Sequence, residues 1–73
     1  MEDREYLAVV EEAGDNFSAF LPDVPGCIAT GATVDETLAE LRSALKFHLD
    51  GMKLAGLPIP KPRTRAARVT AGV

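Results

Sequence analysis

The 73-residue sequence predicts a single α+β domain, spanning residues 1–73, in which three strands, one long helix and a final strand follow one another. Three observations support this order. Short apolar segments separated by turn residues occupy the first third of the chain, and apolar residues then recur every three or four positions. Near the end, apolar residues alternate with polar ones and glycine. This β-β-β-α-β order predicts a four-stranded mixed sheet, in spatial order 3-2-1-4, with one helix on one face.

The first two strands are predicted near residues 5–12 and 16–21, on either side of the turn cluster Ala13–Asn16. The centre of the first strand, Leu7–Val10, is apolar at every position, so this strand is expected to lie inside the sheet with cover on both faces. The second strand follows the turn directly, which favours an antiparallel hairpin.

A turn at Pro25-Gly26 leads into the third strand, predicted near residues 27–31. Proline restricts φ to about −65° and glycine tolerates positive φ, as the two central positions of a type II turn require. Helix formation then begins after Thr33, whose side chain can accept from the amide of Glu36 while the Glu36 carboxylate reaches back, forming a capping box.

The helix is predicted near residues 34–55. Its apolar stripe is expected to face the core and comprises Val34, Leu38, Leu41, Leu45, Leu49 and Met52. Gly56 suits a left-handed position just past the helix end, with Leu57 closing onto Met52. A proline-rich connector, residues 57–63, should be extended, and the alternation beyond it predicts a last strand near 66–72.

Composition predicts self-association. A chain this short builds a small core, and its single cysteine and single histidine offer neither an intramolecular disulfide nor a zinc site. One helix covers only one face of the sheet, so a homodimer or tetramer is expected. The candidate oligomer-interface residues, some of which should lie on the uncovered face, are Tyr6, Val10, Phe20 and Ile28.

Charge is divided along the chain. Residues 1–52 hold all eleven acidic residues and only three basic ones, whereas residues 53–73 hold five basic residues and no acid. Two interpretations remain open: a basic tail that matches an acidic body within one chain, or an acidic body that meets a basic partner. The polar N-terminus and the lack of a long apolar run predict a cytoplasmic chain without signal peptide or membrane anchor.

The sequence resembles the HicB-like antitoxins of bacterial toxin–antitoxin systems. The resemblance covers roughly residues 5–62 and lies in the run Phe20–Cys27, in the long helix and in the proline-rich exit. The motif positions that we interpret as structural are Pro22, Pro25, Gly26, Cys27, Gly31 and Thr33. The resemblance implies a partial ribonuclease H-like fold and a small mRNA-cleaving toxin whose active site the antitoxin blocks.

This sequence departs from many members of that family, because no DNA-binding module follows Val73. The expectation is therefore a solitary partner-binding domain. The alternative is an orphan module of the same fold that acts as a regulatory or scaffolding subunit without a toxin. Direct binding of DNA or RNA is not favoured, because the basic tail has no aromatic residues for stacking.

Four acids are the candidate partner-binding residues, expected to meet basic side chains of a toxin: Asp15, Asp23, Asp35 and Glu36. For Asp23 a second interpretation is local hydrogen bonding that stiffens the turn at Pro22–Gly26. An Asp23→Asn variant separates the two, because only the first interpretation predicts weaker partner binding at unchanged stability.

Enzymatic activity is not predicted, and neither is a cofactor or metal. Two-metal phosphodiester cleavage needs several converging carboxylates, whereas the first strand is apolar at its centre and the last strand contains no acid. Cys27 is interpreted as a small buried side chain and His48 as a partly packed surface residue, so neither is a candidate catalytic group.

Overall fold

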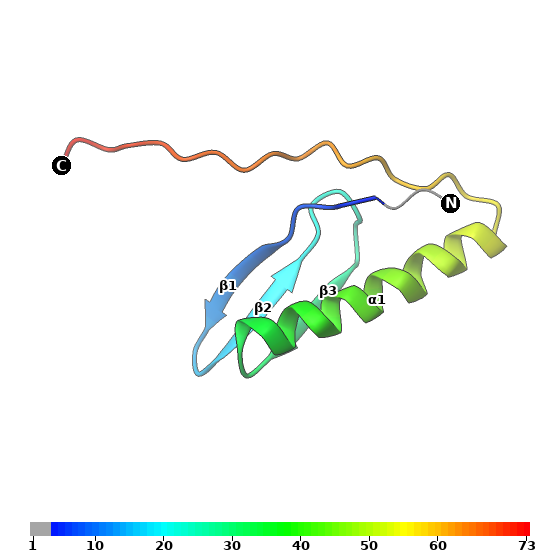
Figure 1. Cartoon of the computed structure of the whole chain (residues 1–73), viewed down its shortest axis with the longest axis horizontal. Coiled ribbons are helices and arrows are strands. Elements are labelled where there is room, and N and C mark those ends of the chain that lie inside the picture. The colour runs from blue at the N-terminus through cyan, green and yellow to red at the C-terminus, as the bar shows by residue number, and fades with distance from the viewer. Residues whose placement is uncertain (1–3) are drawn as a thin grey trace.

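The computed structural model describes residues 4–73 and consists of one antiparallel sheet with one helix packed across it (Figure 1). The strands are β1 (Val9–Ala13), β2 (Asn16–Phe20) and β3 (Ile28–Gly31), in spatial order β1-β2-β3. The helix α1 (Val34–Leu54) follows β3. The α+β class and the first four elements therefore agree with the sequence analysis.

The predicted four-stranded sheet of order 3-2-1-4, and with it the ribonuclease H-like arrangement, is wrong for this structure. Residues 66–72 are extended but belong to no strand, and β1 pairs with β2 alone among the described residues. Consequently β1 is an edge strand rather than a central one. An alternating sequence indicates extended backbone with two different faces, but it does not determine which edge, if any, that backbone meets.

The first strand is also shorter than predicted, because β1 begins at Val9 instead of near residue 5. Val9 pairs with Phe20, the last residue of β2, and the chain beyond Phe20 turns away. Without a fourth strand on the other side, residues 5–8 have no neighbouring strand to pair with.

The two predicted turns are confirmed. Gly14 connects β1 to β2 with a φ of 74°, beside the pair Ala13↔Asn16. Gly26 has a φ of 84°, and the amide of Cys27 donates to the carbonyl of Val24 at 3.2 Å, which closes the turn at Pro25-Gly26. Glycine is favoured at both positions because other residues are strained at positive φ.

The helix begins and ends as its sequence predicts, with one exception. The Thr33 side chain accepts from the amide of Glu36 at 3.1 Å, but the reciprocal bond from the Thr33 amide to the Glu36 carboxylate is not formed. At the other end Gly56 has a φ of 72°, and the amides of Gly56 and Leu57 donate to the carbonyls of Lys53 and Met52. These two bonds form a Schellman motif after Leu54.

The core lies between the sheet and the first half of α1 and is small. Its buried apolar residues are Ala19, Leu21, Val24, Cys27 and Leu41. From the predicted stripe only Leu41 is fully buried, whereas Val34 is 40% exposed, and the second half of α1 extends past the sheet (Figure 1). None of these buried residues is aromatic, and so small a core stabilises the domain modestly.

Close approach of β3 to α1 requires Gly31. A Cβ atom at this position would lie 2.7 Å from the Oγ1 and 2.8 Å from the amide nitrogen of Thr37. Thr37 is fully buried, and its hydroxyl donates to the carbonyl of Thr33 at 2.7 Å. The glycine therefore allows the start of the helix to pack directly on the sheet.

After the helix, the connector (residues 57–63) runs back along the N-terminal segment, as Figure 1 shows. The Arg4 guanidinium donates to the carbonyls of Ile59 and Pro60, and the Tyr6 hydroxyl donates to the carbonyl of Pro60. Two segments more than fifty residues apart in the sequence are thereby joined.

Candidate protein interface

Three of the four candidate partner-binding acids lie at one end of the molecule. Asp15 belongs to the β1–β2 turn, whereas Asp35 and Glu36 form the first turn of α1. The strand register places these segments together. Ala13 pairs with Asn16 at the β1–β2 turn, and the next residue of β2, Phe17, pairs with Gly31, the last residue of β3 before the helix. Figure 1 shows the β1–β2 turn beside the start of the helix.

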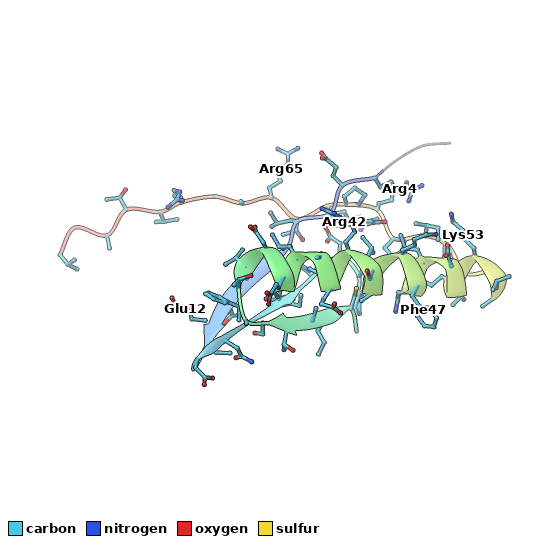
Figure 2. All side chains as sticks on the ribbon, turned by 60° about the horizontal axis from the view of Figure 1, so that its bottom comes forward. Arg4, Glu12, Arg42, Phe47, Lys53 and Arg65 are labelled. Atoms are coloured by element: carbon cyan, nitrogen blue, oxygen red, sulfur yellow. The ribbon has the colours of Figure 1, made fainter. Side chains whose placement is uncertain are left out.

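Glu12 extends this group. It is an exposed residue of β1 next to the same turn, and Figure 2 shows it to the left of the start of α1. We call the set Glu12, Asp15, Asp35 and Glu36 the acidic end. Its side chains are exposed, so their charges act outward on an approaching molecule and are screened by salt.

The helix contributes to the placement of two of these charges. The first amides of a helix lack intrahelical acceptors and carry partial positive charge, which favours carboxylates in the first turn. Asp35 and Glu36 occupy that turn, and Lys53 lies in the last one. The acids are therefore compatible with helix stability while they remain free to contact a cation.

Asp23 lies at the opposite end of the strands, in the β2–β3 connection, and is already engaged. Its Oδ2 accepts from the amides of Arg63 and Thr64 at 2.8 and 2.9 Å, and its Oδ1 accepts from the Thr64 hydroxyl at 2.8 Å. These bonds, the one from the Thr64 amide foremost, hold the pKa of the Asp23 carboxyl below its usual value. Asp23 is an anchor for the end of the connector.

Neither interpretation of Asp23 from the sequence describes this contact. The carboxylate bonds residues forty positions away, whereas the turn at Pro22–Gly26 is closed by backbone hydrogen bonds. No local pattern connects Asp23 with Thr64, because the contact depends on the path of the connector over the whole sheet.

The four candidate oligomer-interface residues are divided between the two faces of the sheet. Tyr6 and Val10 pack against the core on the helix side. Phe20 and Ile28 are paired across β2 and β3 and are 38% and 69% exposed. Cross-strand partners share a face, so Val9, which pairs with Phe20, joins them on the side away from α1.

We call the set Val9, Phe20 and Ile28 the open face. Sequence reasoning missed Val9, because Val9 and Val10 are equally apolar and only the register assigns each to a face. On this face Ile28 is the most exposed side chain, whereas Val9 is half-buried.

The contact between the basic tail and the acidic body does not depend on ion pairs. The ion pair found among residues 4–73 joins Lys46 to Asp50 at 3.2 Å, and both residues lie on the exposed side of the helix. The tail is held instead by backbone groups of residues 59, 60, 63 and 64. Figure 2 shows Arg65 directed away from the body.

The described residues contain no group of three or more potential metal ligands. Cys27 is buried in the core, and burial raises the pKa of its thiol, which disfavours the reactive thiolate. His48 is half-buried on the helix. Residues 4–73 also include no helix that is both long and apolar enough to cross a membrane.

Comparison with known proteins identifies the family. Residues 6–71 match the model of the HicB-like antitoxin of bacterial toxin–antitoxin systems. The chain is 34% identical over 56 residues to an uncharacterized 14.9 kDa protein of the rep-hol intergenic region of Haemophilus phage HP1. That alignment covers 77% of this chain and 42% of the phage protein. No solved structure matches. The chain therefore belongs to the HicB-like antitoxin family of bacterial toxin–antitoxin systems.

Proposed function

We propose that this domain binds and masks a small mRNA-cleaving ribonuclease toxin, without catalysis of its own. Membership of an antitoxin family indicates a role in a toxin–antitoxin system with a toxin as partner. The observation that supports masking is the acidic end, where the end of β1, the β1–β2 turn and the first turn of α1 bring acids together on an exposed surface. Because the target is mRNA, we place this activity in the cytoplasm.

The chemistry of such a toxin explains the choice of surface. A protein that binds RNA presents lysine and arginine side chains to the phosphate backbone. Carboxylates at the same positions compete with those phosphates and form charge-assisted hydrogen bonds with the same donors. Asp15, Asp35 and Glu36 would contact the toxin directly, whereas Asp23 would act through the connector that it anchors.

We further propose that the chain self-associates through the open face, as a homodimer or tetramer. Exposed apolar side chains on one sheet face favour burial against a second copy, particularly in a domain with so small a core. The acidic end remains accessible in such an assembly, because its loops lie at the end of the strands.

A growth experiment tests the masking function. Each short reading frame beside the gene is expressed from an inducible promoter, alone and together with this chain. One frame should arrest growth with cleavage of cellular mRNA, and the chain should restore growth by forming a stoichiometric complex with that product. If no frame is toxic, or if the chain fails to relieve the arrest, masking is wrong and the orphan module is the better description.

Charge variants then locate the surface. The double variant Asp15→Asn/Asp35→Asn should weaken the complex by about a hundredfold or more, since each of the two charge-assisted contacts contributes roughly 1.5–3 kcal/mol. Asp50→Asn is the matched control, because it also removes a helix carboxylate but lies far from the acidic end. Equal losses in both variants would remove the acidic end from the interface. Circular dichroism at each step verifies that the variants are folded.

A further inference from the structure

The second half of α1 carries two large apolar side chains that are exposed. Phe47 is 83% exposed and Leu54 is 92% exposed. Figure 2 shows Phe47 on the side of the helix away from the connector. Gly51 lies between them in the sequence, and a Cβ atom there would meet nothing within 4 Å. We call Phe47, Gly51 and Leu54 the apolar ridge.

The residues of the apolar ridge share one side of the helix. Positions i, i+4 and i+7 lie on one face of an α-helix, and this is the spacing of the anchors that a helix inserts into an apolar groove of a partner. The side of α1 that packs on the sheet holds other residues, Leu38, Leu41 and Leu45. The apolar ridge is therefore a second apolar surface of the helix, separate from the core.

The apolar ridge continues a row of acidic residues along the same side of α1. Successive members of this row are three or four positions apart, so they form one stripe on the helix. We call this set the outer stripe: Glu36, Glu40, Ser43, Phe47, Gly51 and Leu54. All six residues are exposed. The outer stripe is thus acidic in the first half of the helix and apolar in the second half.

Glu40 adds negative charge to the outer stripe without support from the helix. It lies beyond the first turn of α1, where the helix dipole no longer favours a carboxylate. It is four positions from Glu36, and two like charges at this spacing destabilise a helix. Within residues 4–73 neither carboxylate forms an ion pair. Because Glu36 belongs to the acidic end, the outer stripe connects the acidic end to the apolar ridge.

The length of the outer stripe matches the size of one small protein. A specific interface buries about 800 Å² on each partner, whereas an aromatic side chain buries about 150–250 Å². The apolar ridge is therefore too small to form an interface alone. From Glu36 to Leu54 the outer stripe is about 27 Å long, at 1.5 Å per residue, which is close to the diameter of a small domain. One partner that lies along α1 contacts both parts.

We propose that the apolar ridge inserts into an apolar pocket of the same toxin whose basic side chains meet the acidic end, so that the toxin lies along α1. This inference rests on the proposed masking function and deepens it. Phe47 is the anchor of the contact, because well-packed aromatic side chains contribute more to affinity than a charged rim. The acids steer the approach of the toxin, and the apolar ridge slows its release. The open face, on the side of the sheet away from α1, stays available for self-association.

Binding of the toxin found in the growth experiment tests the proposal. Phe47→Ala and Leu54→Ala should each raise the dissociation constant of the complex by about tenfold to a hundredfold, mainly through faster dissociation. The salt dependence of binding should be unchanged in both variants, because no charge is removed, whereas Glu40→Gln should weaken it. Alanine is a strong helix former, so α1 is retained in both alanine variants.

Val69→Ala is the matched control, because Val69 is 94% exposed but lies outside α1. Its dissociation constant should stay within about twofold of the original. If the unaltered chain masks the toxin and both ridge variants bind equally well, masking stands and the apolar ridge is not part of the interface. If the unaltered chain masks no toxin, both proposals fail. A changed oligomeric state of Phe47→Ala in light scattering would assign the ridge to a second copy of the chain and overturn the proposal.

Discussion

At the residue scale, Asp23 shows how one carboxylate can organise two distant segments. It accepts three hydrogen bonds from Arg63 and Thr64, two of them from backbone amides. Hydrogen bonds to the ionised form lower the pKa of a carboxyl. The bonds therefore lower the pKa of Asp23, because they stabilise its charged form. The same bonds fix the position of the end of the connector.

This arrangement predicts a pH dependence. Because the pKa of Asp23 is lower when the protein is folded, its contribution is present above the usual carboxyl pKa and is lost as pH falls through the lowered value. The protection of the Arg63 and Thr64 amides, measured relative to the intrinsic exchange rate at each pH, should therefore fall in acid. Asp23→Asn should produce the same loss of protection at neutral pH, measured by NMR.

The matched control for that experiment is Asp15→Asn, which removes the same charge from the β1–β2 turn. It should leave the amides of Arg63 and Thr64 protected. If both variants release these amides equally, net charge rather than the specific contact holds the connector.

At the element scale, the packing of β3 on α1 depends on the absence of a side chain at one position. Gly31 faces the backbone and side chain of Thr37, the fully buried residue in the first turns of the helix. The same helix contains Gly51, where a Cβ atom would meet nothing within 4 Å. A side chain at residue 31 would therefore clash with Thr37, whereas a side chain at residue 51 would meet open space.

Alanine substitution should separate them. Gly31→Ala should lower the free energy of unfolding by about 1–3 kcal/mol, because backbone atoms of Thr37 would have to move. Gly51→Ala should raise it by about 0.5–1 kcal/mol through the helix propensity alone. Urea denaturation of both variants measures the difference, and an unchanged midpoint for Gly31→Ala would show that the contact is not restrictive.

At the scale of the whole molecule, the chain forms a small core, an open face and an exposed, extended segment at residues 65–73. Only five apolar residues of the described chain are fully buried, whereas Ile28 on the open face is 69% exposed. Domains of this size commonly require an additional source of stability. The proposed self-association through the open face would supply it.

The open face has its own test. Ile28→Lys should weaken self-association measured by sedimentation, because it places a charge among Val9 and Phe20. The unfolding free energy of the monomer should change by about 0.5 kcal/mol or less, since the residue is exposed. Phe47→Lys, at an apolar position on α1 that is 83% exposed, should leave assembly unchanged. Loss of assembly in Phe47→Lys but not in Ile28→Lys would assign the interface to the helix.

The features that were predictable from sequence are local ones. The type II turn at Pro25-Gly26, the cap at Thr33 and the helix end at Gly56 each depend on residues within a few positions of one another. The acidic end was predictable in part, because Asp15, Asp35 and Glu36 were identified, whereas Glu12 and the common location of the four acids were not. That location depends on the strand register.

Local sequence signals were sufficient for the first four elements, their turns and caps, and the resemblance to HicB-like antitoxins, because short-range propensities and motifs specify these. Long-range packing set the remaining features. It assigned Val9 and Val10 to opposite faces, joined Asp23 to Thr64 and left residues 65–73 outside the sheet. These outcomes depend on which distant segments meet, and alternation or charge in one segment does not specify its partner in another.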